Sequence, residues 1–132
     1  MKPIFLLAAA PVCTPAAVSA AEITTHVLDL ARGVGGRDIP VLLSKRSGGG
    51  QWSELAKSRT DENGRVRAFP DAKSLEAGTY KLQFDMSAYP AASGGTPFFP
   101  EIDVVFRVTD TAAHYHVPVV VSPFGYSTYR GN

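Results

Sequence analysis

The chain has 132 residues, with 13 Lys and Arg, 12 Asp and Glu, and a formal net charge of +1. This length suits one domain, and a hydrophobic fraction of 45% with a charged fraction of 19% is ordinary for a globular protein. These values exclude a disordered chain, a collagen-like fibre and a disulfide-stapled miniprotein, and the near-neutral charge gives no reason to expect nucleic acid or an anionic membrane as a partner.

The first 20 residues have the pattern of a secretory signal peptide. A basic start at Lys2 leads into an apolar run, and small residues follow up to Ala20 and Ala21, which is the arrangement that signal peptidase accepts. We therefore predict a signal peptide over residues 1–20, cleaved after Ala20 or Ala21, and a mature domain over residues 21–132. The alternative is an N-terminal membrane anchor, but the apolar run is shorter than the roughly 20 residues that span a bilayer. We therefore expect cleavage, and no membrane association after it.

Cleavage would also limit the chemical groups available to the mature chain. It removes Cys13, the single cysteine, so the domain has neither a thiol nucleophile nor a disulfide. It removes Lys2 as well, which leaves 12 basic and 12 acidic side chains. A short, neutral, exported domain without cysteine favours the bacterial periplasm over a eukaryotic exterior, and we predict a periplasmic location.

The rest of the chain alternates strand patterns with turns that contain Gly, Pro or Asn. Short runs rich in β-branched and aromatic residues, several of alternating polarity, are typical of strands. The predicted strands are residues 23–30, 39–45, 51–60, 65–69, 78–85, 102–108 and 114–122. Strands of this number and spacing predict an all-β fold, an antiparallel sandwich or barrel.

Local patterns give three finer expectations. An Asn-Gly pair predicts a tight turn over residues 61–64, because it supplies positive φ. The turn at residues 110–111 is expected to pair residues 114–122 with the strand before them. Residues 87–92 are the one segment that we expect to form a short helix, which Pro90 limits.

The three histidines of the mature chain are candidates for proton-transfer chemistry. His26 lies within the first predicted strand, while His114 and His116 point to one face of the last, because alternate side chains of a strand share a face. Imidazole is the side chain best matched to acid–base work near neutral pH. The alternatives are satisfied core or surface histidines, and a zinc site, for which three histidines are a complete ligand set.

Arg65 and the C-terminal tail carry further polar groups. Arg65 follows the predicted turn and is either a solvated arginine or a clamp for an anion or carbonyl, because guanidinium presents paired donors. Tyr129 and Arg130 lie close to the end of the chain, soon after a strong strand. Their types suggest a tail that is held in place rather than a frayed end.

Five blocks of the mature chain, in order, resemble the 5-hydroxyisourate hydrolases, the transthyretin-related enzymes of urate breakdown. The blocks are THVLD at residues 25–29, NGR at 63–65, FFPEI at 98–102, HYHVP at 114–118 and SPFGYSTYRG at 122–131. The Tyr-Arg-Gly ending separates these enzymes from the hormone carrier transthyretin, which has the same fold and a different tail.

The resemblance implies a fold, a reaction and a site. The fold is a transthyretin-like (prealbumin-like) antiparallel β-sandwich of about seven to eight strands with one short helix, in a homotetramer whose sites lie in a channel between dimers. The reaction is hydrolysis of 5-hydroxyisourate to 2-oxo-4-hydroxy-4-carboxy-5-ureidoimidazoline, with no cofactor or metal. The implied catalytic residues are His26, Arg65 and His116, one of the two histidines being the general base. The implied substrate-binding residues are His26, Arg65, Tyr129 and Arg130.

This chain departs from the family pattern at its last residue. The family usually ends Tyr-Arg-Gly-Ser, whereas this chain ends in Asn132, which keeps hydrogen-bonding capacity and lacks the hydroxyl. We expect activity to survive this change, and a secondary role at most for His114. The alternative function is a non-catalytic carrier of a small ligand in the same channel. Two histidines and an arginine on the channel wall argue against it.

Overall fold

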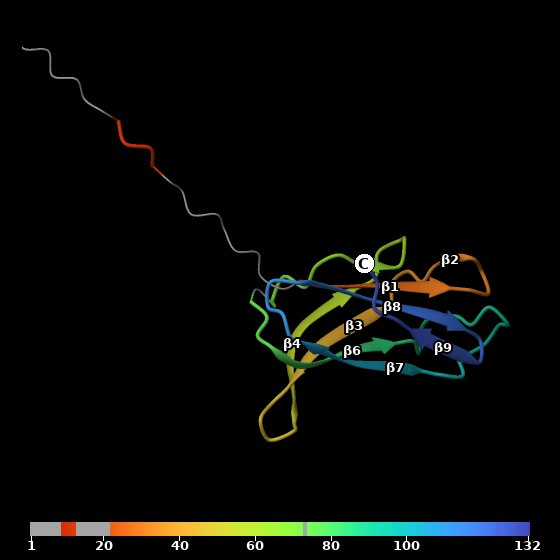
Figure 1. Cartoon of the computed structure of the whole chain (residues 1–132). Helices are drawn as coiled ribbons and strands as arrows, with labels where there is room; N and C mark the ends of the chain where they lie inside the picture. The colour runs from red at the N-terminus through yellow and green to blue at the C-terminus, as the bar shows by residue number, and fades with distance from the viewer. Residues whose placement is uncertain (1–8, 13–21, 73) are drawn as a thin grey trace, which may run out of the picture.

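The computed structural model describes residues 9–12, 22–72 and 74–132. The predicted signal peptide lies almost entirely outside these ranges, as do Cys13 and both predicted cleavage positions. Over the described residues the chain folds as a two-layer β-sandwich without a helix (Figure 1). The predicted all-β sandwich is therefore confirmed.

Two sheets make up the sandwich in the described part of the chain. The first has the order β2-β1-β8-β9, with β5 also beside β1; its strands are β1 (Glu22–Asp29), β2 (Val34–Gly35), β5 (Arg65–Val66), β8 (His114–Ser122) and β9 (Gly125–Thr128). The second has the order β4-β3-β6-β7; its strands are β3 (Pro40–Arg46), β4 (Trp52–Arg59), β6 (Gly78–Asp85) and β7 (Glu101–Val108). The hairpin that joins β3 to β4 projects beyond the body of the sandwich (Figure 1).

The core lies between the inner faces of the two sheets, where alternate side chains of the strands meet. Every second side chain of β1 and of β6 is buried, as the two-residue period of a strand requires. The largest fully buried side chains include Tyr80, Phe84, Leu43 and Ile39. The remaining side chains of β1 and β8 point outward, so the outer face of the first sheet is available for polar groups.

β8 does not form the predicted hairpin with the strand before it, and that prediction is wrong. β7 pairs with β6 in the second sheet, whereas β8 pairs in parallel with β1 and antiparallel with β9. The turn at residues 110–111 thus carries the chain from one layer to the other. The Tyr115 hydroxyl holds this crossover, since it accepts hydrogen bonds from the N–H groups of Thr109 and Asp110 at 3.1 and 3.0 Å. The first sheet is therefore mixed rather than purely antiparallel.

The predicted short helix over residues 87–92 is also wrong. The segment is a turn, closed by a hydrogen bond from the N–H of Tyr89 to the carbonyl oxygen of Met86 at 3.0 Å. Pro90 follows and lacks an N–H, so the next hydrogen bond of a helix cannot form. The described ranges contain no helix long and apolar enough to cross a membrane.

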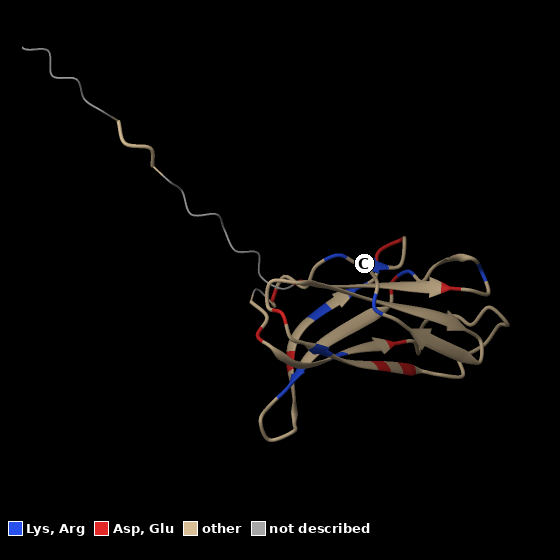
Figure 2. Cartoon of the chain, in the orientation of Figure 1, with Lys and Arg blue, Asp and Glu red and all other residues tan. Residues whose placement is uncertain are grey.

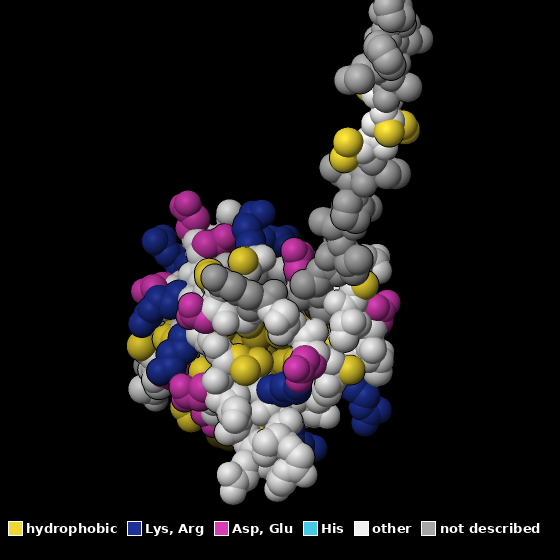
Figure 3. All heavy atoms as spheres, turned by 90° about the vertical axis from the view of Figure 1, so that its left-hand side faces the viewer, with side chains coloured by type: hydrophobic (Ala, Val, Ile, Leu, Met, Phe, Trp, Pro, Cys, Tyr) yellow, Lys and Arg dark blue, Asp and Glu magenta, His cyan; other side chains and the backbone are white. Residues whose placement is uncertain are grey.

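Charged side chains of both signs are spread over the molecule. Lys and Arg, and likewise Asp and Glu, are scattered over strands and loops (Figure 2). On the face drawn in Figure 3 they are interspersed around a group of apolar side chains. This mixing agrees with the formal net charge of +1, and that face has no extended surface of a single charge.

Candidate active site

The predicted site residues of β1, β5 and β8 lie on the outer face of the first sheet. Thr25 and Val27 of β1 and Tyr115 of β8 are buried, so the side chains between them point outward. An open pocket of about 300 Å³ lies over this face. Its walls are formed by Thr24, Thr25, Arg65, Val66, Arg67, His114, His116 and Asn132. The pocket therefore contains groups from both ends of the folded domain and from its middle.

His116 is the half-buried histidine of the pocket. The parallel pairing of β1 with β8 puts it opposite Thr24, and its Nδ1 lies 2.8 Å from Thr24 Oγ1. Burial lowers the pKa of His116, and the positive charges of Arg65, His114 and His26 lower it further. A lowered pKa keeps the imidazole neutral near pH 7, which is the form that can accept a proton.

His26 lies beside this pocket and is held by the loop before β5. Its Nε2 lies 2.8 Å from the backbone oxygen of Asn63. A carbonyl oxygen only accepts hydrogen bonds, so Nε2 of His26 is the donor in this contact. The antiparallel register of β1 with β5 places His26 opposite Arg65.

Arg65 owes its position to the turn over residues 61–64. Asp61 organises this turn, because its Oδ1 accepts hydrogen bonds from the N–H groups of Asn63 and Arg65, both at 2.9 Å. Only Gly64 has positive φ there, at 80°, so the tight turn forms with one left-handed residue. It delivers the chain to β1 rather than back to β4. Arg65 lines the pocket, and no carboxylate of the described chain forms an ion pair with it.

The C-terminal tail closes one side of the pocket. Gly131 forms a bridge with His116, in which the Gly131 N–H donates to the His116 carbonyl oxygen at 2.8 Å. A Cβ atom at position 131 would lie 2.6 Å from Cδ2 of the His116 ring, so only glycine fits against this imidazole. Asn132 follows and lines the pocket. The tail is therefore ordered against the histidine, in agreement with the pattern of its sequence.

Tyr129 and Arg130 are placed elsewhere within the chain. They line a groove of about 230 Å³ beside β7, together with Tyr115 and Val117. The Arg130 guanidinium carbon lies 4.8 Å from the centre of the Tyr115 ring, a cation–π contact that fixes the tail. The structure thus brings Arg65 and His116 together, sets His26 beside them, and leaves Tyr129 and Arg130 outside this pocket.

Several residues that line the pocket were not predicted from the sequence, and Thr24 has the most contacts with its histidines. Its Oγ1 lies 2.8 Å from His116 Nδ1 and 3.2 Å from His114 Nε2. Alternation along β1 was the available signal, since residue 24 must share a face with His26. Its partners were not predictable, because they depend on the parallel pairing with β8.

The zinc alternative has no matching cluster in the described part of the chain. No group of three or more His, Cys, Asp or Glu side chains is placed there to hold a metal ion. His26 is held by a backbone oxygen, and His114 and His116 share the Thr24 hydroxyl. The described residues therefore offer a pocket of hydrogen-bonding groups.

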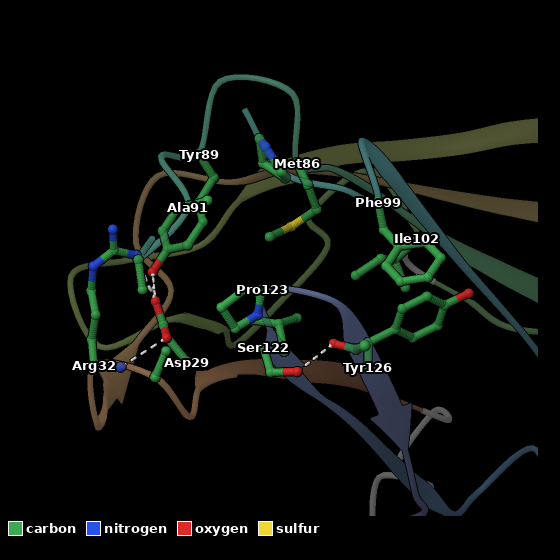
Figure 4. A pocket seen from close by; sticks show the side chains of 15 residues that line it. Asp29, Arg32, Met86, Tyr89, Ala91, Phe99, Ile102, Ser122, Pro123 and Tyr126 are labelled. Carbon is green, nitrogen blue, oxygen red and sulfur yellow. Dashed lines mark hydrogen bonds and ion pairs between the residues drawn. The ribbon is translucent and has the colours of Figure 1, made fainter. Parts of the chain in front are cut away.

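A second cavity, of about 40 Å³, lies where β1 and β8 end (Figure 4). Asp29 is 4% exposed there and accepts hydrogen bonds from Arg32 Nη1 at 2.8 Å and from the Tyr89 hydroxyl at 2.5 Å. Burial raises the pKa of Asp29, but the hydrogen bonds from Tyr89 and Arg32 lower it below its ordinary value. This small cavity, with its carboxylate already paired, anchors loops and is not a candidate for catalysis.

Comparison with known proteins finds both 5-hydroxyisourate hydrolases and transthyretin as relatives. The 5-hydroxyisourate hydrolase of Caulobacter vibrioides is 41% identical over 115 residues, which cover 83% of this chain and 97% of the relative. The structure of the Klebsiella pneumoniae 5-hydroxyisourate hydrolase matches with a TM-score of 0.70 and 32% identity, over 84% of this chain and 99% of the other. Transthyretin from Sparus aurata matches with a TM-score of 0.72 and 28% identity, over 83% and 96%.

The sequence profile of one family covers nearly the whole described domain. This profile, described as the HIUase/Transthyretin family, matches residues 23–131, a span that includes β1, β5, β8 and the Tyr-Arg-Gly tail. The resemblance drawn from the sequence is thus confirmed. The chain belongs to the HIUase/Transthyretin family.

Proposed function

We propose that this protein hydrolyses 5-hydroxyisourate to 2-oxo-4-hydroxy-4-carboxy-5-ureidoimidazoline in urate breakdown. The observation that carries the proposal is the tail, which seats Gly131 on His116 and brings Asn132 to a pocket lined by Arg65. The match with this chain extends over 97% of the Caulobacter vibrioides relative and 99% of the Klebsiella pneumoniae structure, both named 5-hydroxyisourate hydrolase. The same arrangement gives a reason for the Tyr-Arg-Gly ending.

We assign the general base to His116, which the structure supports over His26. Nε2 of His26 is occupied by the Asn63 carbonyl oxygen, whereas His116 uses Nδ1 for Thr24 and keeps Nε2 for water. Water adds to C6 of the substrate as His116 takes its proton. Collapse then breaks the C6–N1 bond, and N1 receives the proton. A positioned base typically contributes about 10²–10⁴-fold.

Arg65 supplies the positive charge of the proposed mechanism. As water adds to C6, negative charge develops on the carbonyl oxygen, and a guanidinium without a carboxylate partner stabilises it. Paired donors of Arg65 also suit the polar edge of a purine-like ring. His26, fixed opposite Arg65, orients the substrate. No cofactor or metal is needed, because the ring carbonyl is already activated.

We further propose that the protein works as a homotetramer with sites in a channel between dimers. Large apolar side chains are exposed on loops and strand ends of the described chain, among them Leu30 at 67% and Phe124 at 75%. Covering them in an assembly is favourable. The role of Tyr129 and Arg130 in substrate binding stays a prediction, and Arg130 on Tyr115 also fixes the tail.

Export to the periplasm is part of the same proposal and rests on the sequence of residues 1–20. Its test is the mass of the protein, which identifies its first residue, after expression in a bacterium with its own secretion machinery. A mature chain that begins at Ala21 or Glu22 is the expected result, and an intact Met1 start in the cytoplasm would contradict it.

The function is tested by the optical activity of the product. 5-Hydroxyisourate generated from urate by a urate oxidase decomposes on its own, and an asymmetric site adds speed and selects one stereoisomer. We expect the purified chain to produce a strong circular dichroism signal of the product that the uncatalysed reaction lacks. A folded chain that leaves both rate and signal unchanged would favour the carrier function, for which the sea bream transthyretin solved with thyroxine is the structural parallel.

A further inference from the structure

Four polar side chains form a continuous line that leads away from His116. His116 Nδ1 lies 2.8 Å from Thr24 Oγ1, which lies 3.2 Å from His114 Nε2. On the far side of the His114 ring, Nδ1 lies 3.5 Å from Oε2 of Glu22. Exposure rises along the line, from half-buried His116 to Glu22, whose side chain is 75% exposed. The line therefore connects the pocket to solvent.

The hydrogen bonds in this line can run in only two directions, because the single Thr24 hydroxyl donates to one histidine while it accepts from the other. If His116 donates through Nδ1, Thr24 donates to His114 Nε2, and Nε2 of His116 has a lone pair. If His114 donates through Nε2, His116 receives the Thr24 proton at Nδ1, and its Nε2 carries a proton and cannot act as a base. The direction of these hydrogen bonds thus determines whether Nε2 of His116 has a free lone pair and can accept a proton.

Glu22 selects the first direction. A carboxylate beside Nδ1 of His114 favours the proton on that nitrogen, which leaves Nε2 of His114 as the acceptor for Thr24. Glu22 is well exposed, so its effect on the His114 tautomer is modest. The hydrogen bonds at 3.2 and 2.8 Å then set the direction of the Thr24 hydroxyl and the tautomer of His116. Each donor along the line then faces an acceptor.

We propose that Thr24 and His114 form a proton relay that holds His116 with its proton on Nδ1 and receives charge from it during turnover. This inference rests on the proposed hydrolysis with His116 as base. Both residues act through His116 and are positioning residues. Nothing in the relay reaches the reacting carbon.

The proton balance of the relay closes over one cycle. As the oxygen of water bonds to C6, its proton moves to Nε2 of His116. The Nδ1 proton of His116 shifts to Thr24 Oγ1, and the Thr24 proton shifts to Nε2 of His114, which becomes an imidazolium beside Glu22. When the C6–N1 bond breaks, N1 takes the proton from Nε2 of His116, and the two other shifts reverse.

The charges around His116 explain why such a relay is useful. Arg65 faces it from β5, His26 from β1 and His114 along β8, and Arg67 lines the same pocket. All of them are cationic or become so on protonation, so they disfavour positive charge on His116. Moving that charge to His114, which lies on the more exposed side of the pocket and next to the Glu22 carboxylate, lessens the conflict.

The test replaces Thr24 by the isosteric Val, by Ser, and compares both with a matched control. Thr128→Val is the control, because Thr128 also donates a hydroxyl hydrogen bond within the first sheet, to the Pro118 carbonyl oxygen at 2.8 Å. We expect Thr24→Val to lower kcat about ten- to hundredfold with KM within about threefold. Thr24→Ser should keep kcat within about threefold, and Thr128→Val should match the wild type.

The second readout is the ¹⁵N spectrum of the histidines in the protein without substrate, which reports the tautomer directly. We expect His116 to be protonated at Nδ1 in the wild type and in Thr24→Ser, and to lose this preference in Thr24→Val. A wild-type His116 protonated at Nε2, or an unchanged tautomer with unchanged kcat in Thr24→Val, would overturn the relay. Because this spectrum needs no turnover, an inactive wild type with the expected tautomer would contradict the hydrolase proposal and leave the relay geometry standing.

Discussion

The variant Gly131→Ala tests how closely the C-terminal tail must fit against His116, the proposed general base. In the variant Gly131→Ala the new Cβ would lie 2.6 Å from Cδ2 and 3.3 Å from Cγ of the His116 ring. Carbon atoms in contact normally lie about 3.5–4.0 Å apart, so the ring or the tail must move by about 1 Å. A misplacement of that size costs about 100-fold, which corresponds to about 2.7 kcal/mol of transition-state stabilisation.

Gly125→Ala provides the matched control for this prediction. A Cβ at that position meets its nearest atom, Ser122 Oγ, at 3.6 Å, an ordinary contact, and neither glycine has the positive φ that disfavours alanine. The assay compares kcat/KM for 5-hydroxyisourate and the thermal midpoint of wild type and both variants. We expect only Gly131→Ala to lose activity, with both midpoints near that of the wild type. Activity of Gly131→Ala within threefold of the wild type would refute the claim that the tail positions His116.

Three further predictions follow from the site and from the cavity of Figure 4. His116→Ala and Arg65→Ala should each lower kcat/KM about 10²–10⁴-fold with unchanged far-ultraviolet circular dichroism, and wild-type turnover in both would refute the site. The pKa of His116 is lowered by burial and then by its positive neighbours, so the acidic limb of the kcat/KM profile should lie below the ordinary value of 6.5. The unfolded chain takes up this proton first, so the unfolding free energy should also fall as the pH drops from 6.5 through the lowered value; a limb above 6.5 would contradict the cause given. Tyr89→Phe removes a donor to the buried Asp29 carboxylate and should lower the unfolding free energy in urea by about 2 kcal/mol with kcat unchanged, whereas an equal loss of kcat would show that the two ends of β1 are coupled.

Much of the fold was predictable because alternation is a local property. The β-branched residues of segment 23–30 indicated β1, and the two-residue period of a strand then fixed which side chains share a face with His26. The order of the strands was not predictable in the same way. A parallel and an antiparallel partner leave the same pattern in β8, so the turn at residues 110–111 suggested a hairpin where the chain crosses between layers.

The candidate site was also only partly predictable from the sequence. His116 and Arg65 were predictable from their motifs, and the structure brings them into one pocket. Thr24 was not, since its contact with His116 arises from the parallel register of two strands 92 residues apart in sequence. The steric role of Gly131 was also hidden, because it depends on a single contact with an imidazole ring. Contacts between distant segments leave no local pattern.

The most direct test of the account is a turnover assay of the purified mature chain. 5-Hydroxyisourate is generated in place from urate with a urate oxidase, and its near-ultraviolet absorbance is followed with the chain, with His116→Ala and with a chelator. We predict faster decay with the wild type, no effect of the chelator, and a rate close to the spontaneous one for His116→Ala. Decay at the spontaneous rate with a folded wild-type chain would contradict this prediction.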